Sequence, residues 1–502
     1  MLFPTFTFAC FFLVVLVVHW SIHQRPLAWR IFILAASYVF YGWWDWRFSF
    51  LLAGSTIGNQ LFAWAIYEAR SEQARRVLAI AAVAANLVVL GFFKYYGFFA
   101  DSVRSSFGRL GLPDPPLLHV LLPIGVSFFT FQALSYVLDV RRGQLRPVGL
   151  LDFAVYLSFF PHLVAGPIVR ASEFLPQLGG VARRHRVDLT RAMCLIGAGL
   201  FKKVVISSYV SANIVDPVFA APDRHSALDV AFGIYGYAVQ IYADFSGYTD
   251  IAIGLALLLG FQFPQNFDRP YTATSIQEFW RRWHMTLSRW LRDYVYISLG
   301  GNRDGPTRRD VNLFLTMLLG GLWHGAAWTF VLWGALQGVG LVVERRVRDR
   351  RQLVGAARAV PAAAGPHSEL DTGTEVGTGA AVERGAAVAA ARRRAWLGRL
   401  YTFNFICLGW VFFRSPSIGN ALDVLGRLLT GWGQPSTLTL LMVLTILGTL
   451  AVQFIPPEVP ARAMALASRL PVGLLAVGFG LLLVVIDVLG PDGVAPFIYF
   501  RF

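Results

Sequence analysis

Long apolar runs separated by short charged loops fill the first third of the chain. Five of these runs lie near 3–21, 29–46, 49–67, 76–99 and 118–138. A membrane-spanning helix needs about 20 mainly apolar residues, so this pattern predicts a series of spans. The loops near 25, 72 and 143 carry an excess of arginine. Because basic loops stay on the cytoplasmic side, we expect these loops in the cytoplasm and the N-terminus outside.

Later segments interrupt the apolar pattern with breakers or charges. Residues 159–170 contain two prolines and a glycine, which predict a broken or re-entrant segment rather than a continuous helix. Lys202 and Lys203 lie within an apolar run, and we expect them near the interface, where long side chains reach water. Asp244 and Asp250 lie within another run and are expected to face a polar interior, with an interfacial loop as the alternative.

Residues 275–296 are too charged to span a membrane but have a helical apolar periodicity. Trp280, Trp283 and Leu287 share one face, and arginines cover the opposite side. Tryptophan at headgroup level and arginine towards phosphate are typical of an amphipathic helix on the cytoplasmic membrane surface. His284 falls at the seam between the two faces, where it can point inward.

Composition agrees with a polytopic membrane protein, because 56% of the 502 residues are hydrophobic and only 15% are charged. The fold class that we expect is an all-α membrane bundle with about 11–13 membrane segments, some of them broken. The net charge of +15 follows the positive-inside pattern and does not predict nucleic-acid binding. We divide the chain into a membrane core at 1–349, a disordered cytoplasmic insert rich in Ala, Gly and Arg at 350–396, and further helices of the core at 397–502.

A histidine deep in apolar sequence is the first candidate for chemistry. His324 lies between the apolar runs 312–322 and 326–343, and burial favours a neutral imidazole because desolvation penalises charge. A neutral imidazole can act as a general base and remove a proton from a hydroxyl that attacks an activated acyl group. His284 is the second candidate. The alternative for each is a structural hydrogen bond to a neighbouring helix, and no ligand set for a metal is evident.

Several motifs resemble the membrane-bound O-acyltransferase family, and especially its branch of bacterial alginate O-acetylation proteins. The resemblance covers nearly the whole chain except the 350–395 insert. The runs that carry it are Gln240–Gly254, Asn266-Phe267, Phe279–His284, Gly320–Gly325 and Gly409–Arg414, with Leu122–Phe128, Pro161–Pro167 and Phe201–Lys203 similar to that branch as well.

This resemblance implies a helix bundle with a funnel through a thin centre and His324 as the catalytic residue at the constriction. The earlier family histidine matches His284. The residues expected to contact substrate are Trp323, Asp244, Tyr248, Asp250, Asn266 and Arg282. For Asp244, Tyr248 and Asp250 the alternative is a role only in holding the bundle together.

The resemblance also implies the donor, the location and the partners. The donor would be acyl-CoA, first of all acetyl-CoA, or a carrier-bound thioester, with no tightly bound cofactor. The chain would lie in the bacterial cytoplasmic membrane among lipids and would work with an extracytoplasmic acetyltransferase that modifies a polysaccharide.

Three other functions remain open at this stage. One is transfer of D-alanine or a longer acyl chain to an envelope polymer. Another is a transporter or flippase, in which the intramembrane Asp and His side chains would carry protons or ions. The third is a non-catalytic scaffold, which predicts that replacement of His324 leaves function intact.

Overall fold

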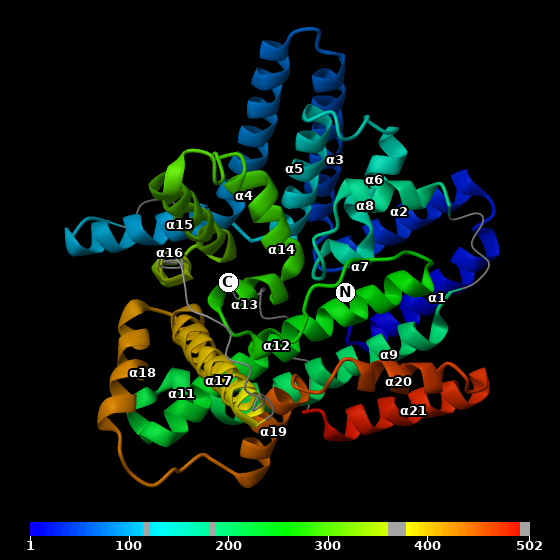
Figure 1. Cartoon of the computed structure of the whole chain (residues 1–502). Coiled ribbons are helices and arrows are strands. Elements are labelled where there is room, and N and C mark those ends of the chain that lie inside the picture. Colours follow the sequence, from blue (N-terminus) through cyan, green and yellow to red (C-terminus); the bar gives the residue numbers. More distant parts are fainter. Residues whose placement is uncertain (114–117, 119, 181–186, 360–377, 492–502) are drawn as a thin grey trace, which may run out of the picture.

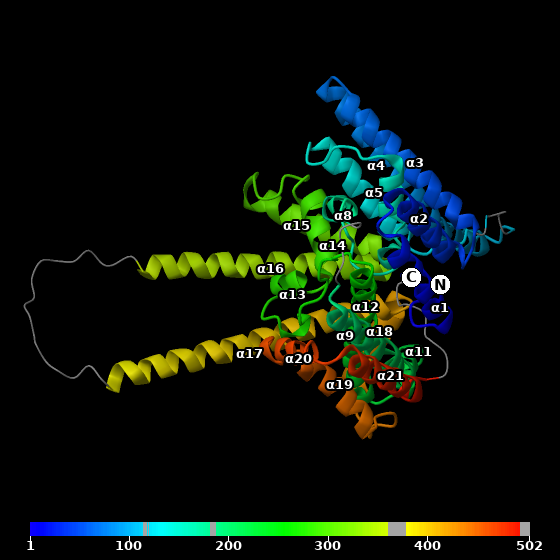
Figure 2. The same ribbon diagram turned by 90° about the vertical axis from the view of Figure 1, so that its right-hand side faces the viewer.

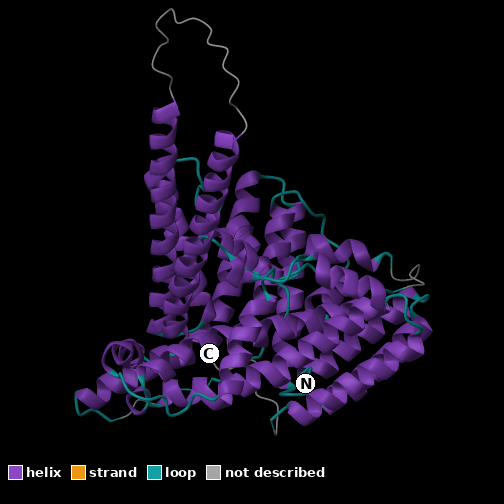
Figure 3. Ribbon diagram, turned by 60° about the horizontal axis from the view of Figure 1, so that its bottom comes forward, coloured by secondary structure: helices purple, strands orange, loops and turns teal. Residues whose placement is uncertain are grey.

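The computed structural model describes residues 1–113, 118, 120–180, 187–359 and 378–491, and every regular element in these ranges is helical (Figure 3). The predicted all-α class is therefore confirmed. The helices of the first half are α1 (Phe6–Ile22), α2 (Pro26–Gly42), α3 (Arg47–Glu68), α4 (Glu72–Arg109), α5 (Val126–Arg141), α6 (Leu150–Ser158), α7 (Phe160–Leu163), α8 (Ala171–Leu178), α9 (Leu189–Leu200), η2 (Phe201–Ser207), α10 (Ser208–Val210), η3 (Ser211–Val215), α11 (Asp216–Ala220) and η4 (Pro222–Arg224).

The elements of the second half begin with the largely buried helix α12. They are α12 (Ala227–Leu258), η5 (Pro270–Thr272), α13 (Ile276–Arg282), α14 (Met285–Trp290), η6 (Leu291–Tyr296), α15 (Gly305–His324), α16 (Trp328–Ala359), α17 (Thr378–Arg414), α18 (Ile418–Thr430), α19 (Leu440–Val452), α20 (Glu458–Ala467) and α21 (Val472–Leu489).

Helix α12 runs through the middle of the bundle and is buried on almost every side (Figure 1). Its neighbour α9 approaches closely at two facing glycines. A Cβ atom at Gly247 would lie 2.8 Å from the Gly199 carbonyl oxygen, and one at Gly199 would lie 2.6 Å from the Gly247 carbonyl oxygen. Such contacts are shorter than real Cβ atoms tolerate, so only glycine at both positions allows this close helix packing.

Three described helical segments are long and apolar enough to cross a membrane, namely Glu72–Arg109, Leu189–Ala220 and Val472–Leu489. The shorter helices α1, α2 and α19 are also strongly apolar. Leucine, valine and tryptophan side chains point outward from many of these helices, as expected where lipid rather than water surrounds the protein. The number of membrane segments given above stays a prediction.

The first four predicted spans correspond to α1–α4, whereas the fifth becomes helical only at Val126. The reason is local. Gly125 has a φ of +79°, and a Cβ there would lie 2.6 Å from the Leu163 carbonyl oxygen. The chain therefore enters α5 through a left-handed residue pressed against the broken segment. That segment is broken as predicted, because the short helix α7 is followed by irregular backbone to Arg170.

The prediction of one continuous amphipathic helix over 275–296 is wrong. The segment forms three short helices, α13, α14 and η6, and His284 between the first two has a φ of +41°. A non-glycine residue in this left-handed region is held there by its surroundings. Trp283, His284 and Leu287 are buried in the core, so the segment folds into the bundle.

Helices α16 and α17 extend side by side well beyond the rest of the bundle (Figure 2). Their far ends differ from the predicted disorder, because α16 continues to Ala359 and α17 begins at Thr378. Alanine-rich sequence with arginine has high helix propensity, which outweighs the lack of apolar periodicity. The remainder of the predicted insert, 360–377, lies outside the described residues, and the division into three parts stays a prediction.

Candidate active site

His324 is the last residue of α15, and glycines fix its position by bringing α15 against α16. A Cβ at Gly321 would lie 2.4 Å from the Phe330 carbonyl oxygen, and one at Gly325 would lie 2.1 Å from the Phe330 ring. Neither position can hold a larger residue without moving the hairpin. The tight turn after α15 therefore presents His324 at a defined place between the two helices.

Aromatic rings surround the His324 imidazole, which is 4% exposed. Its ring centre lies 5.0 Å from those of Trp323 and Trp333 and 5.2 Å from that of Phe413, all in edge-to-face geometry. These rings come from α15, α16 and α17. An aromatic cage of this kind orients the imidazole and limits access of water.

Lys94 and Tyr95 of α4 hold the end of α15 from the other side. The Lys94 ammonium donates hydrogen bonds to the carbonyl oxygens of Trp323 and His324, the latter at 3.0 Å, and the Tyr95 hydroxyl donates to the Leu322 carbonyl. The last carbonyls of a helix have no partner within it and carry the negative end of the helix dipole. A cation in this place stabilises the end of α15 and the turn that carries His324. The sequence reasoning missed Lys94, although a lone charge inside the predicted span 76–99 is a usable signal.

His284 lies at the break between α13 and α14, with its ring 4.6 Å from Phe245 and 6.3 Å from Trp323 between ring centres. Its Nδ1 is 3.1 Å from the Asn266 side-chain oxygen, which also accepts from the Thr286 backbone N–H at 3.1 Å. Because that oxygen accepts, Nδ1 must carry the proton, and the lone pair of a neutral ring sits on Nε2. This Nε2 has no hydrogen-bond partner among the described residues.

Asn266 thus lies beside His284, and it also connects three segments. Its side-chain oxygen accepts from the Thr286 hydroxyl at 2.9 Å, and that hydroxyl accepts from the backbone N–H of Ile168 in the broken segment at 3.0 Å. Trp323 is likewise close, since its ring lies between the two histidines. The structure therefore brings together His324, Trp323, His284 and Asn266.

The acidic motif of α12 lies elsewhere, facing η2. Lys203, only 1% exposed, forms an ion pair with Asp244, and Lys202 pairs with Asp250 at 2.5 Å. The expectation that both lysines lie near the interface is wrong for Lys203, because a buried carboxylate compensates its charge. The ring of Tyr248 lies 5.4 Å from the Lys203 ammonium. These contacts favour the packing role considered above for Asp244, Tyr248 and Asp250.

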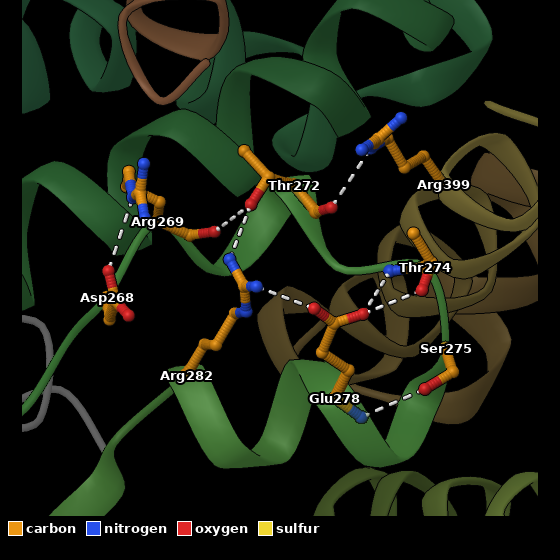
Figure 4. Close-up of polar contacts among 8 residues, drawn as sticks. All are labelled: Asp268, Arg269, Thr272, Thr274, Ser275, Glu278, Arg282 and Arg399. Atoms are coloured by element: carbon orange, nitrogen blue, oxygen red, sulfur yellow. Dashed lines mark hydrogen bonds and ion pairs between the residues drawn. The ribbon is translucent and has the colours of Figure 1, made fainter. Parts of the chain in front are cut away.

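Arg282 also binds protein groups, in a network that fixes the segment before α13 (Figure 4). Its guanidinium donates to the Thr272 hydroxyl at 2.8 Å and pairs with Glu278 at 2.6 Å. Glu278 also accepts from the backbone and hydroxyl of Thr274 at 2.8 and 2.7 Å. Burial raises the pKa of Glu278, but the bonds from Thr274 and the charge of Arg282 lower that pKa by more. The carboxylate therefore stays ionised and Arg282 is held as a structural cation.

Two cavities are lined by the segments that carry the two histidines. The first, here called the His324 cavity, has a volume of about 430 Å³ and includes Lys94, Trp323 and His324 together with Leu2, Trp44 and part of 121–128. The second, here called the arginine cavity, has a volume of about 600 Å³ and includes five arginines, Arg281, Arg289, Arg292, Arg345 and Arg348. Met285, next to His284, also lines it.

Helix α15 connects the two cavities. Its residues Leu313, Thr316 and Met317 line the arginine cavity, and Trp323 and His324 line the His324 cavity. The seven residue steps from Met317 to His324 correspond to about 10 Å of helix. Among the described residues, no group of three or more His, Cys, Asp or Glu side chains is placed to bind a metal ion.

Comparison with known proteins gives a family and its relatives. Residues 116–362 match the model of the membrane-bound O-acyltransferase family. A protein named probable alginate O-acetylase from Pseudomonas aeruginosa is 40% identical over 393 residues, which are 78% of this chain and 67% of that protein. A peptidoglycan O-acetyltransferase of Helicobacter pylori is 35% identical over 429 residues, 80% of this chain and 74% of that protein.

A more distant relative is a teichoic acid D-alanyltransferase of Streptococcus thermophilus, 30% identical over 44% of this chain and 56% of that protein. The chain spans about two thirds of the length of the alginate relatives that it matches. The chain belongs to the membrane-bound O-acyltransferase family and is a multi-pass membrane O-acyltransferase related to enzymes that acetylate cell-envelope polymers.

Proposed function

We propose that this enzyme moves an acyl group, first of all acetyl, from a cytoplasmic thioester across the membrane for O-acylation of an extracytoplasmic polysaccharide or another cell-envelope hydroxyl. The observation that supports the proposal is that His324 lines one cavity while Met285, the residue after His284, lines a second cavity of different character. The His324 cavity includes Leu2 and Trp44, which the loop charges assign to the outer side of the bacterial cytoplasmic membrane. We assign the arginine cavity to the cytoplasmic side, because it is lined by five arginines and arginine is enriched on that side of membrane proteins.

His324 is the residue that we assign as general base. Its imidazole takes the proton of the acceptor hydroxyl while the hydroxyl oxygen attacks the acyl carbonyl carbon, and the donor thiol leaves with a proton. The Lys94 contacts support this assignment, because they hold the backbone on which His324 sits. No protein nucleophile is needed. We assign His284, whose ring centre lies 6.3 Å from that of Trp323, to the donor side of the same centre.

The arginine cavity suits a donor with several phosphates, such as acetyl-CoA, or an acidic carrier of the thioester. Arginine binds phosphate through paired N–H groups. Arg281 and Arg345 line this cavity, and neither has an ion-pair partner in the described part of the chain. We therefore expect these two guanidinium groups to bind the donor.

Replacement of both arginines tests the donor site. We expect Arg281→Ala with Arg345→Ala to raise the KM for acetyl-CoA by at least about 100-fold, because each of the two charge-assisted hydrogen bonds lost contributes about 1.5–3 kcal/mol. The turnover number should change much less. The measurement is the initial rate of acetyl transfer against acetyl-CoA concentration in membranes. Arg462→Ala on α20, an exposed arginine away from the cavity, is the matched control. An unchanged KM would rule out this cavity as the donor site.

The chemical nature of the transferred group can be read from the cell surface. In a deletion strain, we expect the wild-type chain to restore alkali-labile acetyl ester on the surface polysaccharide, measured as released acetate at matched membrane levels. The D-alanyltransferase relative supports a second candidate. Release of D-alanine instead of acetate would favour that candidate, and loss of neither ester in the deletion strain would contradict both. A separate extracytoplasmic acetyltransferase is the partner that we expect to complete the transfer.

A further inference from the structure

The outer parts of α16 and α17 carry a dense group of exposed arginines. Both helices extend beyond the rest of the bundle, and together they are here called the arm (Figure 2). Arg350 and Arg351 lie on α16, and Arg392, Arg393 and Arg394 lie on α17, all of them exposed. These arginines are here called the basic collar.

The two helices place the basic collar at a single height on the arm. They run antiparallel (Figure 2), and Gly340 of α16 faces Phe405 of α17, where a Cβ atom would lie 2.3 Å from the phenylalanine ring. The same number of residues further out on each helix stand Arg351 and Arg394. Because the rise per residue is the same in both helices, these two arginines lie at about the same distance from the bundle.

The collar begins where packing against the bundle ends. On α16 the last contact before the collar is the ion pair between Asp349 and Arg309 of α15, at 2.7 Å. On α17 the Trp396 ring stacks on the Phe454 ring, with 5.5 Å between ring centres. Both contacts lie within two residues of the collar. The collar arginines therefore stand just outside the packed core.

The collar charges are not neutralised by the part of the chain that the structure describes. Arg346 and Arg348, which lie nearer the bundle, pair with Asp310 and Glu344 at 2.8 and 2.6 Å. None of the collar arginines forms such an ion pair with a described residue, and the sequence 388–401 contains no acidic residue. A concentration of like charge without internal partners attracts anions from outside the protein.

The surface just inside the collar is typical of a membrane boundary. Trp396, Leu397, Leu400 and Tyr401 of α17 are each more than half exposed, and Val347 of α16 is 42% exposed. Tryptophan and tyrosine concentrate at the level of lipid headgroups. Arginines within one helical turn beyond such residues are placed to reach lipid phosphates.

The charge of the remaining arm favours a lipid surface over a partner protein. The sequence 352–391, between the two halves of the collar, contains two arginines and four acidic residues. A partner that docks along the arm would be attracted by basic charge continuing outward, whereas lipid headgroups meet only residues at the membrane surface. The positive-inside rule accounts for the sign of the collar charge, but it does not require that five arginines gather at one height without acidic partners.

We infer that the basic collar binds the phosphate groups of anionic lipid headgroups at the membrane surface. Arginine binds phosphate through paired N–H groups, and the collar presents several guanidinium groups to neighbouring headgroups. This contact holds the base of the arm at the membrane beside the arginine cavity, which Arg345 and Arg348 of α16 line. The inference does not depend on the proposed acyl transfer.

Native mass spectrometry of the full-length chain, released from detergent micelles, tests the inference. The measurement is the apparent Kd of dioleoylphosphatidylglycerol and of dioleoylphosphatidylcholine, which differ in headgroup charge but have the same acyl chains. We expect the wild-type chain to bind the anionic lipid at least about 10-fold more tightly. The combined substitutions Arg392→Gln, Arg393→Gln and Arg394→Gln should reduce this ratio at least about fivefold. Glutamine keeps the helix propensity of arginine, so α17 should remain intact.

A matched control removes the same charge from another basic loop. Arg70, Arg75 and Arg76 are also exposed and lie in the loop near 72, but Glu68 and Glu72 accompany them. Their replacement by glutamine should change the lipid ratio less than about twofold, because the loop has little net charge to lose. Lysine at the three α17 positions should retain most of the preference. Higher ionic strength should lower the wild-type ratio, since salt screens exposed charges.

Four results would overturn the inference. They are equal affinity of the wild-type chain for both lipids, an unchanged ratio in the folded glutamine variant of α17, an equal loss in the control variant, and displacement of the anionic lipid by glycerol phosphate at similar concentrations. The last would mean that the collar binds phosphate from solution. Displacement by acetyl-CoA would assign the collar to the donor site instead, so the lipid assignment would fall while the proposed function stands.

Discussion

Replacement of His324 by glutamine is expected to lower the rate of acyl transfer about 100- to 10,000-fold, the usual contribution of a positioned general base. Glutamine nearly fills the same space between Trp333 and Phe413 but cannot take a proton at neutral pH. Lys94 binds the backbone carbonyl of this residue and not its side chain, so the capped end of α15 should survive the change. The effect should therefore appear in the turnover number and leave the amount of folded protein unchanged.

The measurement is the initial rate of transfer from labelled acetyl-CoA, divided by the amount of monodisperse protein extracted from membranes. His162→Gln provides a matched control, because His162 is also fully buried but bonds the Tyr156 carbonyl at 2.8 Å and lines neither cavity. That variant should keep most of its activity per folded molecule. A rate above one tenth of the wild-type value for His324→Gln would remove the general base from the mechanism and favour the scaffold hypothesis.

The same assay distinguishes the role of His284. If its Nε2 atom takes part in transfer, His284→Gln should lower the turnover number by more than tenfold with little change in either KM. If the residue only supports the break between α13 and α14 through Asn266, the loss should follow the amount of folded protein instead. Because His284 has a φ of +41°, its replacement can change the stability of the fold. The amount of folded protein must therefore be measured together with the turnover number.

The sequence predicted the parts of this site that depend on burial in apolar sequence. His324 stands out because an ionisable group there is costly unless it has a use, and the broken segment stands out because proline prevents a helix. The break at His284 could not be predicted in this way, since residues 275–296 have a regular helical periodicity. Its cause is tertiary: Asn266 binds the His284 ring and the backbone and hydroxyl of Thr286 after the break, and the Asp268 backbone N–H donates to the Arg282 carbonyl before it.

Pairing of charged and polar side chains between distant helices was the other feature that could not be predicted from the sequence. Lys94 and Lys203 each look like a lone charge that could reach the interface, and only the fold shows the carbonyls or the carboxylate that receives it. The hydrogen bonds from Gln240 to Ser211 and from Ser211 to Asp216 likewise join residues that have no common motif. Polar contacts across a membrane bundle depend on helix register, which single-sequence periodicity does not determine.

Removal of Lys203 alone is expected to destabilise the protein by about 3–5 kcal/mol, because it leaves the Asp244 carboxylate buried without its cation. The two side chains are 1% and 3% exposed, so water cannot compensate for the lost partner. Lys203→Met and Asp244→Leu should each sharply reduce the yield of monodisperse protein and its thermal midpoint. The double variant should recover much of the loss, since an apolar pair of similar volume avoids the desolvation cost altogether.

The neighbouring pair of Lys202 and Asp250 is the internal comparison. These side chains are 19% and 25% exposed, so the same substitutions should cost much less, closer to the 0–1 kcal/mol of exposed pairs. A double variant of Lys203 and Asp244 that is no more stable than either single variant would contradict the ion-pair account. Acyl transfer in the stable double variant then decides the role of α12. Full activity would show that the acidic motif of α12 serves only to pack the bundle. Loss of activity in a folded protein would mean that the buried charges take part in transport or catalysis.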